Sequence, residues 1–494
     1  MVVAGLRELP FPALSSPGAG YVRGMTGRLI IASNRTAAPG ETRAGGLAVA
    51  LADALAERGG GVWFGWSGEV VERETRGVRL FADDKVDFAL ADLTQAEYDG
   101  FYLGYANRAL WPVFHYRVDL ARFEESDFEA YESVNRRFGR LLAQLAREGD
   151  VVWVHDYHFL LMGAEMRASG WNGPMGFFLH IPFPAPEVFT SAPQHQRLAR
   201  GLCAFDLVGF QTQRDTANFR RYLVEQCGAV VNEDGSLSVF DRTLRAETFS
   251  IGVDPDDIAA LANGPGAREA ADRLGRIIDN RALVLGVDRM DYSKGLPQRM
   301  AGFGRVLDDN PDMRGRVSFL QIAPPSREAV DAYQALRVEL DGLAGRINAD
   351  YGDLDWVPIR YLARGYPREV LTGLYRLARV ALVTPLYDGM NLVAKEFVAA
   401  QDPEDPGVLV LSEFAGAAEQ MQSALLVNPH DIAAMADAIR QALVMPLDER
   451  KRRWRAMMDS VEQQDISWWR SAFTDRLAAT RQEEPEAEPE PATE

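Results

Sequence analysis

The sequence predicts an α/β protein with two Rossmann-like, doubly wound domains, and three observations lead to this fold class. The chain has 494 residues, which is more than a single hydrophobic core usually supports. Short runs rich in valine, isoleucine and phenylalanine recur along it, and such near-continuous apolarity is typical of strands buried on both faces of a parallel sheet. Amphipathic segments separate these runs, as expected for alternating strands and helices.

The predicted strands fall into two groups. In chain order they are residues 28–33, 151–156, 175–181, 206–211, 282–287, 317–323, 380–386, 408–414 and 424–429. The amphipathic segments that predict helices include residues 130–147, 296–309, 326–345 and 431–445. The stretch FSIGVDPDD (249–257) interrupts the pattern with glycine, proline and aspartates. We therefore expect a first domain over 27–250 and a second domain over 251–465.

The two ends of the chain lie outside these domains. Residues 1–26 are rich in proline, glycine and serine and predict a disordered N-terminal extension. Residues 466–482 carry Trp468 and Trp469 on an amphipathic pattern, and we expect a C-terminal helix that crosses back to the first domain. Residues 483–494 are rich in proline and glutamate and predict a disordered acidic tail.

The composition excludes several classes of function. The net charge of −18 argues against binding to nucleic acid, which needs a basic face. The N-terminus lacks the pattern of a signal peptide, and no stretch approaches the roughly 20 apolar residues of a membrane span. The two cysteines, Cys203 and Cys227, form no C-x-x-C and fit a reducing compartment. We expect a cytoplasmic protein with neither a membrane nor a nucleic-acid partner.

Two basic residues directly follow the predicted strand 282–287. In VDRMDYSKGLPQR (287–299), Arg289 and Lys294 come just before a predicted helix that starts near Gly295. Ligands of open α/β sheets bind at the carboxyl ends of strands, and a helix N-terminus offers free N–H groups and a positive dipole. Two cations there favour a diphosphate site. The alternative is a surface loop with solvated charges.

A second turn, in LVTPLYDGMNLVAKEFVAAQ (382–401), follows the predicted strand 380–386. Asp388 lies at the strand tip, where it could hold sugar hydroxyls, and the helix is predicted from about Leu392. The N–H groups of residues 391–393 are placed for phosphate oxygens, and Glu396 could accept hydrogen bonds from a ribose. The alternative is a polar helix cap in which Glu396 favours the helix dipole.

Other strand ends in the first half of the chain carry polar residues. Arg35 follows the first strand, and Gly45-Gly46 opens the next helix, where glycine lets a phosphate or sugar approach the backbone. In VVWVHDYH (151–158) a metal site is weakly indicated, because the spacing is not H-E-x-x-H and no third ligand is evident, so Asp156 fits a sugar-hydroxyl acceptor better. His180 is either a core histidine or a ligand to a polar substrate.

Aromatic residues and one further arginine complete the candidates. Tyr102 and Trp111 belong to an aromatic-rich stretch that either packs against a sugar ring or belongs to the core. Arg327 follows the predicted strand 317–323 in LQIAPPSR, which is another strand end with a basic residue.

Together these stretches resemble the trehalose-6-phosphate synthase family over about residues 28–480. The shared motifs are S-N-R with G-G-L-A-V, W-F-G-W-S-G, L-W-P-x-F-H-Y-R, H-D-Y-H, F-F-L-H-I-P-F-P, D-Y-S-K-G-L and D-G-M-N-L-V-A-K-E. The resemblance implies the GT-B glycosyltransferase fold, with the active site in a cleft between the domains. It also implies transfer of glucose from a sugar nucleotide to glucose 6-phosphate, giving α,α-trehalose 6-phosphate with retention at the donor carbon.

The resemblance also implies roles for individual residues. It assigns the donor diphosphate to Arg289 and Lys294, and the donor glucose to His180 and the turn Asp388, Gly389, Met390 and Asn391. The remaining donor residues are Leu392, Val393, Glu396, Gly45, Gly46 and, beside the base, Tyr366. The acceptor residues are Arg35, Tyr102, Trp111, Asp156 and Arg327. We expect no metal or other cofactor, small-molecule substrates only, and a homo-oligomer.

Two alternatives and one departure stay open. A glycogen-synthase-like transferase would share the donor residues but not the acceptor set, and a non-catalytic sugar-phosphate sensor would bind both ligands without turnover. Tyr387 departs from the family, whose members more often carry arginine before the D-G-M-N turn. The base of the donor, UDP, ADP or GDP, is therefore not predicted.

Overall fold

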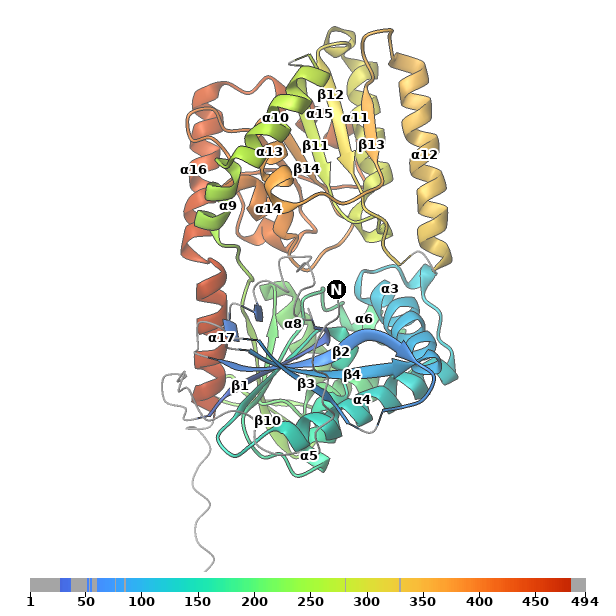
Figure 1. Cartoon of the computed structure of the whole chain (residues 1–494), viewed down its shortest axis with the longest axis vertical. Helices are drawn as coiled ribbons and strands as arrows, with labels where there is room; N and C mark the ends of the chain where they lie inside the picture. The colour runs from blue at the N-terminus through green and yellow to red at the C-terminus, as the bar shows by residue number, and fades with distance from the viewer. Residues whose placement is uncertain are drawn as a thin grey trace, which may run out of the picture.

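The structure is a computed structural model that describes residues 27–36, 51–52, 54–55, 60–75, 77–83, 86–279, 281–327 and 330–480. Two domains lie one above the other in Figure 1, and each is built on its own sheet. The last helices of the chain run along one side of both domains (Figure 1). The predicted extension over 1–26 and the predicted tail over 483–494 lie outside the described residues.

The first domain contains, within the described residues, a ten-stranded sheet in the order β3-β4-β2-β1-β5-β6-β7-β10-β9-β8. The strands from β4 to β10 in this order pair in parallel, and antiparallel pairs form both edges. The order reverses between β1 and β5, so the carboxyl ends of these strands flank a switch point of the kind where ligands bind. The strands are β1 (Leu29–Arg35), β2 (Gly61–Val71), β3 (Arg79–Asp83), β4 (Val86–Thr94), β5 (Val151–His155), β6 (Met175–Phe178), β7 (Leu207–Phe210), β8 (Val230–Val231), β9 (Leu237–Val239) and β10 (Arg242–Thr248).

The second domain contains a six-stranded sheet, again counted over the described part of the chain, in the order β13-β12-β11-β14-β15-β16. All of its strand pairs are parallel. This is the strand order of a Rossmann domain, and its switch point lies between β11 and β14. The strands are β11 (Ala282–Val287), β12 (Val317–Ile322), β13 (Ile359–Leu362), β14 (Val380–Val383), β15 (Val408–Ser412) and β16 (Leu425–Val427).

Helices connect the strands of both sheets. The helices expected over 130–147, 296–309, 326–345 and 431–445 correspond to α4, α11, α12 and α15. The helices are α2 (Gln95–Glu97), the π-helix η1 (Tyr98–Leu110), α3 (Trp111–Phe114), α4 (Glu125–Leu145), α5 (Met162–Ala168), α6 (Pro186–Phe189), α7 (His195–Leu202), α8 (Gln213–Cys227), α9 (Pro255–Ala262), α10 (Pro265–Ile277), α11 (Leu296–Asp309), α12 (Asp331–Tyr351), α13 (Arg368–Leu377), α14 (Leu392–Ala399), α15 (Ile432–Leu443), α16 (Leu447–Gln463) and α17 (Ile466–Thr480).

Strands β10 and β13 were not predicted from the sequence, because neither has a continuous apolar run. In β10 only two of seven residues are buried, and in β13 only Ile359 is buried. The strand predicted over 380–386 ends at Val383 instead. Leu386 donates its N–H to the carbonyl of Ser293 at 2.8 Å rather than to a neighbouring strand, so this segment leaves the sheet.

The described residues also bear on expectations from composition. Cys203 is buried, Cys227 is half-buried, and both thiols are free. None of the helices in the described part of the chain combines the length and the apolarity needed to cross a membrane.

The chain crosses between the domains twice, and the two crossings touch. After β10 the segment 249–254 leads to the second domain, and residues 463–466 lead back to α17. The N–H of Ile466 donates to the carbonyl of Val253 at 3.1 Å. A Cβ on Gly252 would lie 2.3 Å from the carbonyl oxygen of Gln464, so only glycine fits where the crossings meet. The two crossings therefore form one narrow connection.

Replacing Trp469 by alanine is expected to destabilise the protein by about 3–5 kcal/mol, the usual cost of removing a buried tryptophan. The Trp469 ring is fully buried on α17 and lies 4.9 Å from the ring of Trp153 on β5 and 5.1 Å from that of Phe178 on β6. Urea unfolding followed by circular dichroism measures the effect. The half-buried neighbour Trp468 provides the matched control, and an equal loss in Trp468→Ala would contradict this assignment of the packing.

Candidate active site

The predicted site residues gather where the carboxyl ends of the two sheets face each other. Arg327, which follows β12, donates from Nη2 to the hydroxyl of Tyr157 in the first domain at 3.1 Å. Its guanidinium carbon also lies 3.7 Å from the ring centroid of Trp111, again in the first domain. The carboxyl ends of the two sheets are thus joined directly, and residues from both domains can act on the same ligands.

At the switch point of the second sheet, Lys294 and Asp388 form an ion pair. Lys294 ends a short 3₁₀ turn (Tyr292–Lys294) after β11 and is buried, and Asp388 follows β14. Asn391 donates from Nδ2 to Asp388 at 3.0 Å. It precedes α14 with a φ of 70°, a left-handed conformation that asparagine tolerates better than most residues. Three predicted residues therefore form one cluster beside the first turn of α14.

A buried ion pair that was not predicted supports this cluster. Arg299 on α11 is fully buried and donates from Nη2 to Asp288 at 2.7 Å. Asp288 also accepts from Asn391 Nδ2 at 3.2 Å. Arg299 further contacts Thr384 at 3.2 Å, just beyond β14. Both Asp288 and Arg299 stand in the stretch 287–299 that first indicated the site, but nothing in the spacing shows that they pair.

Arg327 is held by a network of side chains from both domains. Its Nη1 donates to Asp291 at 3.1 Å and to the hydroxyl of Tyr333 at 2.7 Å. Burial alone would raise the pKa of Asp291, but Arg327, Arg289 and Lys294 together hold it below its usual range. The site thus keeps a permanent carboxylate beside Arg327. Tyr157 and Tyr333 were not predicted as members of the site.

Arg289 occupies a different position from the other cations. Its side chain is exposed, and its guanidinium carbon lies 5.7 Å from the ring centroid of Trp111. It forms no ion pair with any residue that the structure describes. An exposed guanidinium beside the Lys294 cluster can therefore meet an anion without breaking an existing salt bridge.

Asp156 and His180 lie together at the carboxyl end of the first sheet, after β5 and β6. Asp156 has a φ of 74° and a ψ of 166°, a region that is strained for any residue except glycine. Its Oδ1 accepts from the backbone N–H of His180 at 3.3 Å. The Nε2 of His180 lies 3.0 Å from the Nδ1 of His155. Burial lowers the pKa of His180 to about 3, so the ring is neutral and can exchange hydrogen bonds with hydroxyl groups.

The structure does not bring His155, Asp156 and His158 together as metal ligands. His155 bonds to His180, whereas the ring of His158 stacks on Tyr102 with 5.9 Å between the centroids. Among the described residues no group of three or more histidine, cysteine or acidic side chains is placed to hold a metal ion. The weak metal alternative from the sequence is therefore not supported by these residues.

The aromatic stretch serves both the core and the site. Tyr105 on the π-helix η1 is fully buried against Phe128 and Tyr131. Trp111 begins α3 and faces Arg327 instead, with its ring 4.1 Å from that of His115. Core packing is thus confirmed for Tyr105, whereas the packing of Trp111 against a sugar ring stays a prediction.

The remaining predicted residues lie around this centre. Arg35 is exposed at the end of β1, in register with Trp66, whose ring is 5.6 Å from that of Tyr102. Glu396 accepts from the hydroxyl of Tyr375 at 3.3 Å, and burial raises the pKa of Glu396. Met390 is buried, and Leu392 and Val393 are half-buried on the first turn of α14. The hydroxyl of Tyr366 accepts a hydrogen bond from Nε of Arg364 at 2.7 Å, and Arg364 is not a predicted site residue. Within the described structure, Tyr366 forms no hydrogen bond with a predicted site residue. Gly45 and Gly46 lie outside the described residues.

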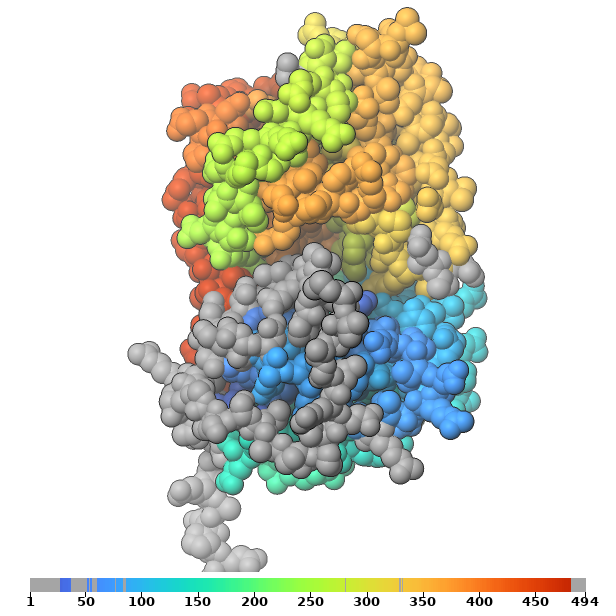
Figure 2. All heavy atoms as spheres, viewed as in Figure 1, coloured from blue at the N-terminus to red at the C-terminus, as the bar shows by residue number. Residues whose placement is uncertain are grey.

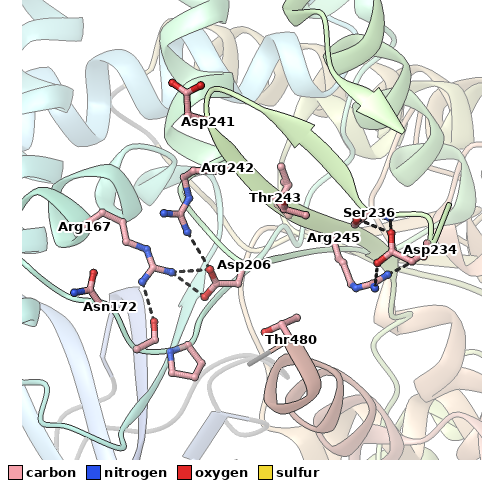
Figure 3. A pocket seen from close by; sticks show the side chains of 13 residues that line it. Arg167, Asn172, Asp206, Asp234, Ser236, Asp241, Arg242, Thr243, Arg245 and Thr480 are labelled. Atoms are coloured by element: carbon pink, nitrogen blue, oxygen red, sulfur yellow. Dashed lines mark hydrogen bonds and ion pairs between the residues drawn. The ribbon is translucent and has the colours of Figure 1, made fainter. Parts of the chain in front are cut away.

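A polar pocket of about 560 Å³ lies at the opposite, amino end of the first sheet (Figure 3). Arg167 and Arg242 both pair with Asp206, at 2.8 and 3.1 Å, and Arg245 pairs with Asp234 at 2.5 Å (Figure 3). Each of these arginines thus pairs with a carboxylate. None of the predicted site residues lines this pocket.

The catalytic efficiency is expected to fall as the pH drops below about 6, because Asp156 then becomes protonated. Burial raises the pKa of this carboxyl to about 6, although backbone N–H groups, Arg327 and Arg289 act in the opposite direction. A protonated Asp156 accepts hydrogen bonds from substrate hydroxyls less strongly. Replacing Asp156 by asparagine should cost roughly 10–100-fold in kcat/KM at pH 7.5.

The pH profile of kcat/KM for wild type and Asp156→Asn provides the measurement. A substrate phosphate also titrates near pH 6, but that contribution is common to both proteins. The variant should lack the additional part of the acid limb that Asp156 causes. Identical acid limbs in the two proteins would contradict the assignment.

The comparisons with known proteins agree with this geometry. A model of glycosyltransferase family 20 matches residues 27–479. A trehalose-6-phosphate synthase of Sinorhizobium fredii is 46% identical over 457 residues, which cover 92% of this chain and 98% of that relative.

Solved structures show the same similarity. The crystal structure of a UDP-forming α,α-trehalose-phosphate synthase from Burkholderia vietnamiensis matches with a TM-score of 0.90 and 48% identity, covering 92% of this chain and 97% of that one. A UDP-forming α,α-trehalose-phosphate synthase from Burkholderia xenovorans, in complex with glucose-6-phosphate, gives a TM-score of 0.88 and 47% identity, with 91% and 100% covered. The predicted GT-B fold and the family indicated by the motifs are confirmed.

Proposed function

The chain belongs to glycosyltransferase family 20, and from its site we propose that it transfers glucose from a nucleoside-diphosphate glucose to glucose 6-phosphate. The products would be α,α-trehalose 6-phosphate and the nucleoside diphosphate. The observation that carries this proposal is that two cationic centres lie beside each other. Lys294 and Arg289 form one centre and Arg327 forms the other, and both Arg289 and Arg327 lie over the ring of Trp111. One centre suits a diphosphate, and the other suits the phosphate of a sugar phosphate.

The donor binds at the switch point of the second sheet. Arg289 and Lys294 stabilise the negative charge that grows on the diphosphate as its bond to the glucose carbon breaks. The N–H groups at the start of α14 add to this field. Asp388, which is held between Lys294 and Asn391, accepts hydrogen bonds from the glucose hydroxyls. These groups supply the positive charge that a divalent metal supplies in other transferases, so we propose a metal-independent reaction.

The acceptor binds between the two switch points. Arg327 and Arg35 bind its phosphate, and the rings of Trp111 and Tyr102 pack against the sugar. Asp156 accepts a hydrogen bond from one of its hydroxyls. Asp291 already bonds to Arg327 at 3.1 Å and orients the guanidinium before the phosphate arrives. A polymer acceptor would not use this phosphate site, which favours the sugar phosphate over a glycogen-like substrate.

We propose that the two substrates react on one face of the donor sugar. The glucose–phosphate bond breaks, the acceptor hydroxyl oxygen forms the new bond, and its proton passes to the leaving phosphate oxygen. The configuration is then retained without a covalent intermediate. Asp388, Asp288 and Asp291 are each held in an ion pair, which weakens them as nucleophiles, and Asp156 is assigned to the acceptor, so no carboxylate is assigned to attack the donor carbon. Isolation of a covalent glucosyl-enzyme would refute it.

Release of nucleoside diphosphate tests the proposed function. UDP-, ADP- and GDP-glucose are each supplied with and without glucose 6-phosphate, in excess EDTA. Release that requires glucose 6-phosphate and persists in EDTA is the expected result. UDP-glucose is the first donor to test, because the two Burkholderia synthases named above are UDP-forming. Binding of both ligands without release would instead indicate a sensor, and loss of release in EDTA would contradict metal independence.

A further inference from the structure

Lys395 is a buried lysine that the proposed mechanism does not use. It lies on α14 and is only 1% exposed. Its Nζ donates to the backbone carbonyl of Ile251 at 2.7 Å, and no carboxylate among the described residues pairs with it. A buried cation without an ionised partner is unfavourable for folding, and an apolar side chain of similar length would avoid that penalty. The position of Lys395 therefore calls for a role other than stability.

The partner of Lys395 belongs to the segment that joins the domains. Ile251 lies in the crossing 249–254 and is itself buried. Its N–H donates to Oε1 of Gln211 at 3.0 Å, and Gln211 directly follows β7 of the first domain. The two backbone groups of Ile251 are thus bound by different domains, its N–H by the first and its carbonyl by the second.

Both side chains that hold Ile251 are also connected to the candidate active site. The Nε2 of Gln211 lies 3.5 Å from Nδ1 of His180, the histidine assigned to the donor glucose. Lys395 stands between Val393 and Glu396, which are assigned to the phosphates and the ribose. The bridge Gln211–Ile251–Lys395 therefore runs from the His180 side of the site to the helix that receives the nucleotide.

We propose that Lys395 and Gln211 are positioning residues that hold the two domains in register through Ile251, so that the donor glucose meets the acceptor. This inference rests on the proposed function, since it concerns the same site. Lys395 touches neither substrate in this arrangement. It acts by fixing α14 and the turn before it relative to His180. Burial lowers the pKa of Lys395 to about 7, and the amine donates a hydrogen bond to Ile251 in either protonation state.

Lys395→Met tests the proposal, because methionine keeps the length of the side chain and removes the donor. We expect kcat to fall about 10-fold or more, in line with the effect of small misplacements of reacting groups. The Kd for UDP should stay within about 2-fold, since Lys395 does not contact the diphosphate. The melting temperature should stay close to that of wild type, because the relief of the buried charge offsets the hydrogen bond lost at the Ile251 carbonyl. Lys451→Met is the matched control, since this lysine pairs with Glu404 on the surface.

Gln211→Leu cuts the same bridge from the other side and provides the second variant. If both residues act through Ile251, the double variant should be about as slow as the slower single variant. If the kcat losses of the two single variants multiply in the double variant, the two residues do not act through Ile251 together. An unchanged kcat in Lys395→Met would contradict the proposed role of Lys395. A loss of melting temperature in step with kcat would show a structural role only. Turnover by the wild-type protein distinguishes a failure of the proposed function from a failure of this inference. If wild type is inactive with every donor, the proposed function fails, and this inference fails with it.

Discussion

Lys294→Ala is expected to lower turnover by about 100-fold or more at saturating concentrations of both substrates. Lys294 is buried and forms its ion pair with Asp388 at the switch point where the diphosphate is proposed to leave. As charge grows on the leaving oxygens, the ammonium is already in place and needs no reorganisation. Its stabilising effect is therefore larger in the transition state than in the bound donor, and the loss should appear in kcat more than in KM.

The control for Lys294→Ala is Lys451→Ala, which removes a lysine on the surface of α16 that pairs with Glu404. It should leave both kcat and KM unchanged. The Lys294 variant also leaves Asp388 without its cation, so part of the loss comes from that buried carboxylate. Asp388→Asn combined with Lys294→Ala separates the two contributions. Near-normal turnover in Lys294→Ala would exclude it from the chemistry.

The strand-end residues of the site were predictable because the sheets are parallel. Arg289, Lys294 and Asp388 each follow a buried apolar run, and the carboxyl ends of parallel strands meet at one edge. The structure shows that β11 and β14, which precede them, are neighbours in the sheet. Lys294 and Asp388 are far apart in the sequence, but their contact could be expected because the topology of a doubly wound sheet brings these strand ends together.

Contacts between residues of distant elements could not be predicted in the same way. Tyr157 and Arg327 meet although 170 positions separate them, and Lys395 meets Ile251 across 144 positions. No local pattern encodes such pairs, because they depend on how the two domains are placed against each other. The contact of Tyr333 with Arg327 could not be predicted either, because Tyr333 lies in α12 at a position that the sequence pattern assigns to the hydrophobic core.

Tyr387 shows how a departure from a family pattern can be interpreted only with the fold. Its departure from the family pattern is the reason why the base of the donor is not predicted from the sequence. In the structure its ring stacks on Tyr116 of the first domain, with centroids 4.2 Å apart, and the guanidinium carbon of Arg214 lies 4.9 Å from it. The residue therefore contributes to the contact between the domains, close to the turn that begins at Asp388.

Gly389→Ala is expected to reduce turnover about 100-fold or more, which is the effect of misplacing reacting groups by about 1 Å. A Cβ on Gly389 would lie 2.3 Å from the backbone carbonyl oxygen of His180 and 3.0 Å from the Cα of Ile181, both in the first domain. These are backbone atoms that cannot move aside as a flexible side chain could. The added methyl group must therefore push the turn of the second domain away from His180, and the donor glucose moves away from the acceptor.

Steady-state kinetics with both substrates, together with UDP binding by calorimetry, measure this effect. The Kd for UDP should change by less than about 5-fold, because the diphosphate contacts of Arg289 and Lys294 lie within the second domain. Gly345→Ala is the matched control, since a Cβ there meets no atom within 4 Å on the exposed surface of α12. That variant should keep full activity and gain about 0.5–1 kcal/mol of stability from better helix propensity. Full activity in Gly389→Ala would mean that the close contact between the turn and His180 is not needed for turnover, and the domains would then react from a more open arrangement.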